Sequence, residues 1–165
     1  MIYLIDSSCF MTASRVTYPI DIAVSFWNKI AELAQSHAFY SIDKVENEIK
    51  INDDMLSSWC SENLPKDFFI STETEEVYKK YAELANWAQS KGINQSGVDK
   101  FIDAEKADIY FVAFCSLNSD KYTVVTEEVS AVNSKKDIKL PDACNAFDVR
   151  SINFMQMLRE LKVQF

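Results

Sequence analysis

The chain begins with a run of four apolar residues, Ile2 to Ile5, that continues directly into a carboxylate, Asp6. An uninterrupted apolar run of this length is typical of a strand that is buried on both faces, as in a parallel sheet. Burying an ionised carboxylate costs free energy unless the group is paired, hydrogen-bonded or bound to a metal. We therefore predict a central strand over Ile2–Asp6, and the carboxylate at its carboxyl end needs a physical explanation.

Predicted strands and helices alternate along the rest of the chain. The clearest helical spacing of apolar residues precedes His37, and the β-branched, aromatic run that ends at Thr126 is the clearest strand. We predict strands over 2–6, 38–42, 68–70, 121–126 and 147–149, and helices over 21–37, 43–51, 54–63, 72–92, 96–106, 108–117 and 151–161. Asp43 is expected to cap its helix, with Glu46 as the capping-box partner.

This alternation implies right-handed crossovers and a mostly parallel sheet, which is an α/β fold. The sequence contains no internal repeat, no low-complexity stretch and no Gly/Ser-rich linker. We therefore expect one domain over residues 1–165.

The composition excludes several classes of protein. Apolar residues make up 48% of the 165, which is enough for a sizeable core and argues against disorder. No apolar run approaches the roughly 18 residues that span a membrane, and no basic leader is present, so we expect a cytoplasmic protein without membrane association. The cysteines form no CxxC pair, so neither a zinc site nor a disulfide framework is expected. The net charge of −8 argues against a broad phosphate-binding surface, but it leaves room for an acidic site that binds a cation.

Carboxylates lie at the predicted carboxyl ends of two strands, where parallel sheets bind their ligands. Asp6 follows the first strand, and Glu127 and Glu128 follow the fourth. A simpler role for Asp6 is to cap the turn formed by the serines that follow it. Position at a strand end does not tell Glu127 and Glu128 apart.

Two further acids lie on predicted helices. Glu48 lies beside a buried helix face, and an ion pair with Lys44 one turn earlier is the simpler explanation. Asp108 begins a helix, where the helix dipole favours a carboxylate. If Asp6, Glu48, Asp108 and Glu128 meet at one edge, their charges repel unless a cation neutralises them. Oxygen ligands suit Mg²⁺ or Mn²⁺, and such an ion assists phosphodiester hydrolysis.

Several motifs of the chain resemble the PIN-domain ribonucleases in their order and spacing. They are YLIDSSCF at the amino-terminus, SIDKVENEI, KADIYFVAFC and YTVVTEE. With IKLPDAC and the closing SINFMQMLRELKVQF, they look like the PIN-like branch described as DUF4411, which is often encoded in prokaryotic toxin–antitoxin pairs. The resemblance covers essentially the whole chain. It implies a three-layer fold with a central, mostly parallel four- to five-stranded sheet flanked by helices.

The resemblance also implies which residues form the site. It makes Asp6, Glu48 and Asp108 catalytic metal ligands, and Thr126 the hydroxyl residue after the fourth strand. Glu128 is the fourth acid, where the family often has Asp or Asn, and this difference leaves the second metal position open. Two further candidate ligands are Glu127, in place of Glu128, and Asp142 in the PDAC motif.

The function that we expect is a Mg²⁺- or Mn²⁺-dependent endoribonuclease, the toxin of a toxin–antitoxin pair. Its partners would be an RNA substrate and a cognate antitoxin, with a homodimer left open. The candidate substrate contacts are Ser7, Thr126, Lys135 and Lys136. Two alternatives stay open: a PIN-like binding module with a degenerate site, and phosphoryl transfer through an aspartyl intermediate at Asp6.

Overall fold

Five short parallel strands form the centre of residues 1–164, the part of the chain that this computed structural model describes. They are β1 (Ile2–Ile5), β2 (Phe39–Ile42), β3 (Phe69–Ile70), β4 (Tyr122–Val125) and β5 (Arg150–Ile152). Their order in the sheet is β3-β2-β1-β4-β5, and every neighbouring pair is parallel. Leu4 is in register with Tyr40 on one side and Val124 on the other. The first strand is therefore the middle strand, as its apolar sequence predicts.

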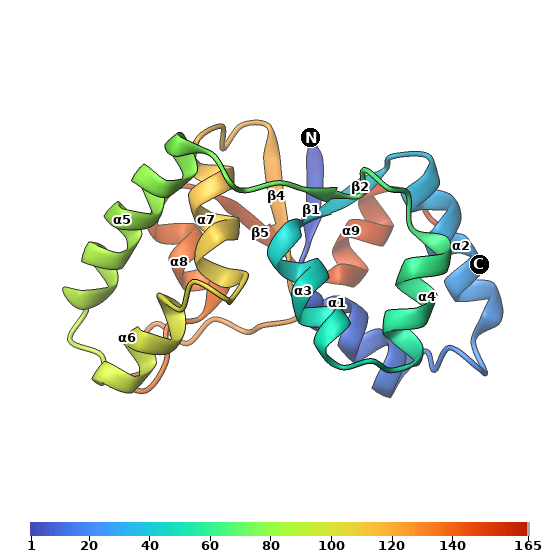
Figure 1. Cartoon of the computed structure of the whole chain (residues 1–165), viewed down its shortest axis with the longest axis horizontal. Helices are drawn as coiled ribbons and strands as arrows, with labels where there is room; N and C mark the ends of the chain where they lie inside the picture. Colours follow the sequence, from blue (N-terminus) through green and yellow to red (C-terminus); the bar gives the residue numbers. More distant parts are fainter. Residues whose placement is uncertain (165) are drawn as a thin grey trace.

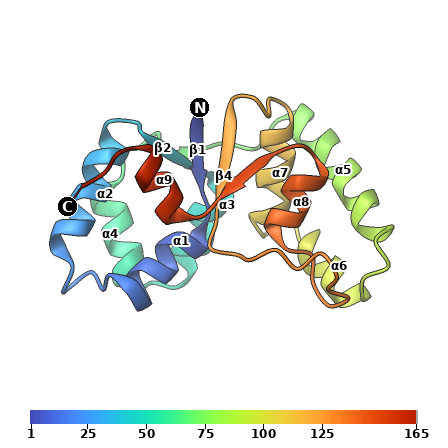
Figure 2. The same ribbon diagram turned by 180° about the vertical axis from the view of Figure 1, so that it is seen from behind.

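Helices cover both faces of this sheet and make three layers. They are α1 (Ser7–Thr12), the π-helical turn η1 (Ala13–Thr17), α2 (Val24–Gln35), α3 (Asp43–Ile51), α4 (Met55–Asn63), α5 (Glu75–Gln89), α6 (Gln95–Phe101), α7 (Asp108–Ser116), α8 (Leu140–Ala146) and α9 (Phe154–Glu160). Figure 1 shows α5 to α8 to the left of the strands, and α1, α2, α4 and α9 to the right. Figure 2 shows the same layers from behind. The predicted three-layer α/β fold is confirmed.

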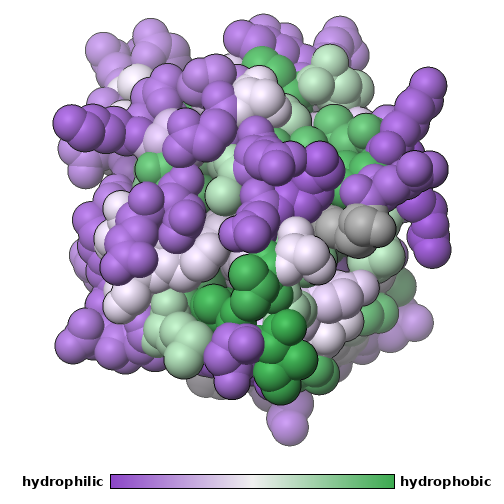
Figure 3. Space-filling model, turned by 90° about the vertical axis from the view of Figure 1, so that its right-hand side faces the viewer, coloured by the Kyte–Doolittle hydropathy of each residue, from purple (hydrophilic) through white to green (hydrophobic). Residues whose placement is uncertain are grey.

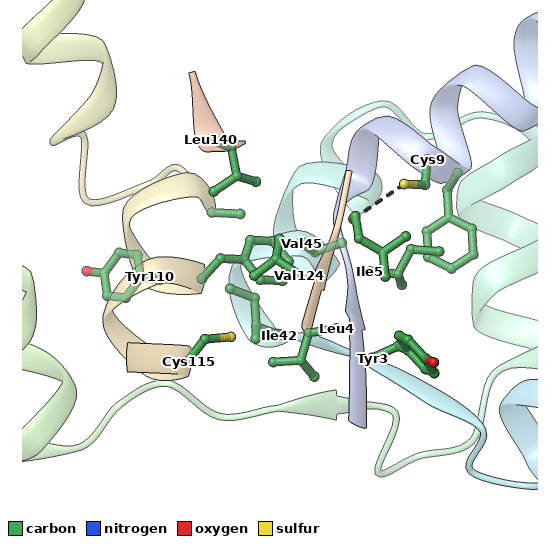
Figure 4. Close-up of a cluster of buried hydrophobic side chains, with 14 of the residues drawn as sticks. Tyr3, Leu4, Ile5, Cys9, Ile42, Val45, Tyr110, Cys115, Val124 and Leu140 are labelled. Atoms are coloured by element: carbon green, nitrogen blue, oxygen red, sulfur yellow. Dashed lines mark hydrogen bonds between the residues drawn. The ribbon is translucent and has the colours of Figure 1, made fainter. Parts of the chain in front are cut away.

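Side chains of β1 alternate between the two faces of the sheet because successive strand residues point in opposite directions. Leu4 points toward the layer that holds Tyr110 and Leu140, whereas Tyr3 and Ile5 point to the opposite side (Figure 4). All five side chains are buried. Both faces of the middle strand are therefore packed against apolar side chains. The carboxylate of Asp6, which follows this strand, lies at the edge of the core.

Several segments differ from the sequence prediction. The helix predicted over 96–106 ends at Phe101, and the one predicted over 151–161 begins only at Phe154, after β5. The sequence predicts no helix where α1 and η1 lie, because this segment is too short to show an amphipathic period. The helix α8 lies between the predicted strands 121–126 and 147–149, where the sequence predicts no element, although Pro141 near its start is a typical helix-start signal. This helix ends at Ala146, and Asp148 has a positive φ of 55°. The last strand is therefore β5, beyond the predicted 147–149.

The predicted capping box at Asp43 is wrong. Asp43 is the first residue of α3, and its carboxylate accepts hydrogen bonds from the backbone N and Oγ1 of Thr72, at 2.9 and 2.7 Å. The other expected member of the box, Glu46, pairs with Lys50 on the surface at 2.5 Å. Asp43 thus connects the start of α3 to the segment after β3, which fixes the helix that carries Glu48.

One face of the molecule carries a concentration of exposed apolar side chains. Figure 3 shows hydrophobic side chains gathered on the lower part of the face that holds α2 and α4, among mostly hydrophilic neighbours. Strongly exposed apolar residues of η1, of the segment before α2 and of the first turns of α2 and α4 are Val16, Ile22, Val24 and Met55.

Within residues 1–164, no helix is both long enough and apolar enough to cross a membrane. The predicted single domain spans residues 1–165, and its last residue lies outside the described part.

Candidate metal centre

Acidic side chains from four separate elements meet at the carboxyl edge of the sheet. Asp6 follows β1, Glu48 lies on α3, Asp108 begins α7, and Glu128 lies three residues beyond the end of β4. Shared hydrogen-bond partners link these residues: Ser7 Oγ contacts both Asp6 and Glu48. Burial and the negative charges of the other three acids raise the pKa of Asp108. The structure therefore brings the four predicted acids to one place, while their catalytic and metal-binding roles stay predictions.

Asp6 is buried, with an exposed fraction of 3%, and it is the N-cap of α1. Its Oδ2 accepts hydrogen bonds from Ser8 Oγ at 2.5 Å, from the backbone N of Ser8 at 3.4 Å and from Thr126 Oγ1 at 3.1 Å. Its Oδ1 has only a long contact of 3.5 Å with Ser7 Oγ. The capping role expected for Asp6 is real, but it occupies one oxygen atom and leaves the other nearly free.

The surroundings of Asp6 oppose its ionisation. Burial raises its pKa to about 6, and the charges of Glu48 and Glu128 add to this effect. The hydrogen bonds from Ser8 and Thr126 act in the opposite direction because they stabilise the ionised form. The ionised form of Asp6 is therefore destabilised by burial and by neighbouring negative charges, and a bound cation would stabilise it.

Both carboxylate oxygen atoms of Glu48 are used by protein donors. Ser7 Oγ donates to Oε2 at 2.6 Å, and the backbone N–H of Ala107 donates to Oε1 at 3.0 Å. The ion pair expected between Glu48 and Lys44 is wrong, because the Nζ of Lys44 lies instead 3.9 Å from a carboxylate oxygen of Glu73. Glu48 therefore faces the site and not the surface of its own helix.

Asp108 differs from the other acids in having no hydrogen-bond partner for its carboxylate among residues 1–164. Burial raises its pKa well above the usual range, and the charges of Asp6, Glu128 and Glu48 raise it further, with a small opposing effect of Lys100. It lies at the first position of α7, where the helix dipole favours a negative charge. An unpartnered carboxylate beside three others is the arrangement that a cation would stabilise.

The structure separates the two glutamates that follow β4. Glu127 Oε1 accepts a hydrogen bond from the backbone N of Phe154 at 3.0 Å, at the start of α9. Glu128 Oε2 accepts one from the backbone N of Leu140 at 3.0 Å, at the start of α8, and its charge raises the pKa of Asp6. Glu128 is therefore the member of the pair that faces the other acids.

Asp142 has local partners outside the group of four acids. Its carboxylate accepts hydrogen bonds from Ser130 Oγ and from the backbone N of Ala131, the latter at 2.8 Å. It also lines a different cavity, together with Trp87 and Ile138. In this arrangement Asp142 fixes the loop after β4, and its role as a metal ligand stays a prediction.

The predicted substrate contacts fall into two groups. The hydroxyl groups of Ser7 and Thr126 donate to carboxylates within the site. Lys135 and Lys136 are exposed on the loop between β4 and α8, which lies against α6 through a 2.8 Å hydrogen bond from Asn94 N to the carbonyl oxygen of Lys135. The roles of these four residues in substrate binding stay predictions.

Sequence reasoning missed two groups that shape the site. The sequence places Ser8 only in the turn after Asp6, whereas its hydroxyl donates the 2.5 Å hydrogen bond to Asp6 and accepts one from the backbone N of Glu127 at 3.1 Å. The backbone N–H of Ala107 carries no sequence signal at all. The serine was detectable in principle because it directly follows a buried acid in a turn.

The donor set fits a hard divalent cation by its chemistry. Within residues 1–164, no group of three or more His, Cys, Asp or Glu side chains is arranged to hold a metal ion as the side chains stand. However, Mg²⁺ is usually bound through one or two carboxylates and keeps several waters. The oxygen atoms with the fewest protein donors are both oxygens of Asp108, Oε1 of Glu128 and Oδ1 of Asp6, which makes these three residues the best candidate ligands.

Comparison with known proteins supports the fold and places the chain in a family. A family model described as "Domain of unknown function (DUF4411)" matches residues 3–165. The structure is similar to a chain in the crystal structure of VapBC2 from Rickettsia felis bound to a DNA fragment from their promoter, with a TM-score of 0.51 and 16% sequence identity. The similarity covers 93% of this chain and 99% of that one, and at this identity it shows the fold alone. No curated protein matches the sequence.

Proposed function

Because this chain belongs to the DUF4411 family and has a PIN-like fold, we propose that it is a metal-dependent endoribonuclease and the toxin of a toxin–antitoxin pair. The observation that carries this proposal is the carboxylate of Asp108, which accepts no hydrogen bond within residues 1–164 although the charges of three other acids act on it. Such crowding of like charges is costly without a counter-ion. A divalent cation supplies that counter-ion and the chemistry of phosphodiester hydrolysis together.

Asp6 and Asp108 would hold Mg²⁺ or Mn²⁺, with Glu128 beside them. When bound, the ion would orient or deprotonate the attacking water and stabilise the charge that develops on the phosphate. Ser8 and Thr126 hold the Oδ2 atom of Asp6, so that its Oδ1 stays available for a ligand. The protein's own contribution is to orient these carboxylates and to hold them close together.

The charge of the chain sets how it would bind RNA. With a net charge of −8, the protein neutralises few phosphates, so we expect a small RNA footprint and a shallow dependence of affinity on salt. Lys135 and Lys136 on the loop after β4 are the candidate contacts to the RNA backbone. The substrate class that fits is a short accessible segment of RNA.

A cleavage assay tests the proposed function. Purified protein should cut RNA when Mg²⁺ or Mn²⁺ is added, and excess EDTA should stop the reaction. Asp6→Asn and Asp108→Asn should abolish cleavage while the circular dichroism spectrum stays native. Glu46→Gln is the matched control, because it removes a charge from the surface of α3, where Glu46 pairs with Lys50. Cleavage that persists in EDTA would refute the metal mechanism.

The second candidate function is a binding module with a degenerate site. It is favoured by the hydrogen bonds that occupy both oxygens of Glu48 and one oxygen of Glu128, and by the absence of a ready-made group of three ligands in residues 1–164. Titration calorimetry distinguishes the two functions, because a degenerate site gives no heat with Mn²⁺. Phosphoryl transfer at Asp6 is the weaker alternative, because the carboxylate is buried and Oδ2 is used in three hydrogen bonds.

A cognate antitoxin is the proposed protein partner. The similar structure from Rickettsia felis is VapBC2 bound to promoter DNA, and the exposed apolar residues around Ile22 offer this chain a surface for a partner. Ile22→Asp should weaken co-purification with the antitoxin and leave RNA cleavage by the isolated protein unchanged. A homodimer is the competing occupant, and light scattering of the isolated wild-type chain would reveal it.

A further inference from the structure

Glu48 has no carboxylate oxygen left without a protein donor. Its Oε2 accepts the hydrogen bond from Ser7 Oγ at 2.6 Å, and its Oε1 accepts the one from the backbone N of Ala107 at 3.0 Å. These donors are respectively 41 and 59 residues away along the chain. By contrast, the carboxylate of Asp108 accepts no hydrogen bond within residues 1–164.

The two donors belong to the two segments that carry the candidate ligands. Ser7 directly follows Asp6 and begins α1, and Ala107 directly precedes Asp108 as the N-cap of α7. Glu48 therefore connects the turn after β1 to the start of α7. Because α3 is itself fixed at its start by the contact of Asp43 with Thr72, Glu48 has a rigid base from which to hold both segments.

We propose that Glu48 is a positioning residue, which sets the separation of Asp6 and Asp108, and does not itself bind the metal ion. The part of this inference that concerns the metal ion rests on the proposed function, whereas the two hydrogen bonds of Glu48 do not depend on any metal. Because each carboxylate oxygen of Glu48 already accepts a hydrogen bond from the protein, Glu48 is a poorer candidate ligand than Asp108, whose carboxylate accepts none within residues 1–164. Glu48 acts through these two contacts, and the two aspartates supply the metal-binding oxygens.

The substitution Glu48→Gln separates positioning from ligation. A glutamine can accept the N–H of Ala107 through its carbonyl oxygen and donate its amide N–H to Ser7 Oγ, so it keeps both contacts but is a poor ligand. Glu48→Ala removes both contacts. Glu46→Gln, on the same helix, controls for the loss of one negative charge.

Calorimetric titration with Mn²⁺ alone is the first measurement. We expect Glu48→Gln to weaken Mn²⁺ binding only modestly, through the loss of a charge that acts on Asp6 and Asp108. Glu48→Ala should bind roughly 10–100-fold more weakly than the wild type, as when a group that orients metal ligands is removed. Asp108→Asn should abolish binding. A loss in Glu48→Gln as large as that in Glu48→Ala would overturn the proposal and make Glu48 a ligand.

Amide hydrogen exchange of the metal-free protein is the second measurement, and it does not depend on any activity. The amides of Ala107 and Asp108 should exchange faster in Glu48→Ala than in the wild type, and Glu48→Gln should restore the wild-type rate. Unchanged exchange in Glu48→Ala would overturn the positioning role. If the wild-type protein gives no heat with Mn²⁺ but the amides of Ala107 and Asp108 still exchange faster in Glu48→Ala, the proposed function is refuted. The positioning role of Glu48 is then still supported.

Discussion

The backbone of Gly97 lies directly against the carbonyl group of Lys136. A methyl group at Gly97 would stand 1.8 Å from the Lys136 oxygen and 2.8 Å from its carbonyl carbon. Both are backbone atoms, so no side chain can rotate to relieve the contact. The glycine allows the loop that carries Lys135 and Lys136 to lie against α6, where Asn94 N donates to the carbonyl oxygen of Lys135 at 2.8 Å.

Gly97→Ala should displace this loop and destabilise the protein. Forcing an extra methyl group into a packed contact costs about 1–3 kcal/mol, which urea denaturation would measure. Ser96→Ala is the matched control, because it adds no atom to an exposed neighbouring position of α6. A Gly97→Ala protein as stable as Ser96→Ala would show that the loop moves without cost.

Glu127 and Glu128 should differ sharply when each is replaced by glutamine. Glu128→Gln removes a charge that acts on Asp6 and Asp108, so it should weaken Mn²⁺ binding measured by calorimetry. Glu127→Gln keeps an acceptor for the backbone N of Phe154 at the start of α9, so it should leave metal binding unchanged. Equal losses in both variants would contradict the separation of the two side chains.

Glu127→Ala should instead reduce stability. The contact with Phe154 N satisfies one of the free N–H groups at the start of α9, and loss of such an acceptor costs about 1 kcal/mol. Urea denaturation of the alanine and glutamine variants would measure the difference. A stability equal in both variants would mean that water replaces the carboxylate at no cost.

Ser8→Ala should destabilise the protein through two groups at once. The hydroxyl donates to Asp6 Oδ2 at 2.5 Å and accepts from Glu127 N at 3.1 Å, so its removal leaves a buried acceptor and a backbone donor with fewer partners. A loss of about 1–3 kcal/mol is expected in urea denaturation. Ser58→Ala, at an exposed position of α4, is the control and should change stability little.

Glu160 should make stability depend on pH in the acid range. Hydrogen bonds from Arg150 (2.6 and 3.1 Å) and Tyr3 (2.7 Å) lower its pKa to about 2, from a usual value of 4.5. Because the folded-state pKa is depressed, this contribution is fully present above about pH 4.5 and is lost as the pH falls toward 2.

The stability difference between wild type and Glu160→Gln should therefore be constant near neutral pH and shrink on acidification. Urea denaturation across a pH series measures this difference, with Glu62→Gln, an exposed position of α4, as the control. A difference that does not change with pH would show that the ionised form of Glu160 contributes no more than an amide does.

Local patterns in the sequence determined the framework of the fold. The apolar run Ile2–Ile5 predicts a strand buried on both faces, and the run ending at Thr126 predicts its neighbour. Since both strands are parallel, the acids that follow them had to reach the same edge. The short segments were harder: α1 and η1 show no long period, and α8 is a helix of seven residues, so burial patterns were too brief to detect them.

Only the tertiary structure decided what each acid does at that edge. The sequence places Glu48 one turn from Lys44 and gives Glu127 and Glu128 equal positions, but it does not contain the direction of a side chain. The fold brings Glu48 of α3 to a backbone N–H 59 residues away, and the starts of α9 and α8 hold the two glutamates apart. The physical reason is that residue periodicity encodes which face is buried, whereas hydrogen bonds between distant segments exist only after those segments have packed.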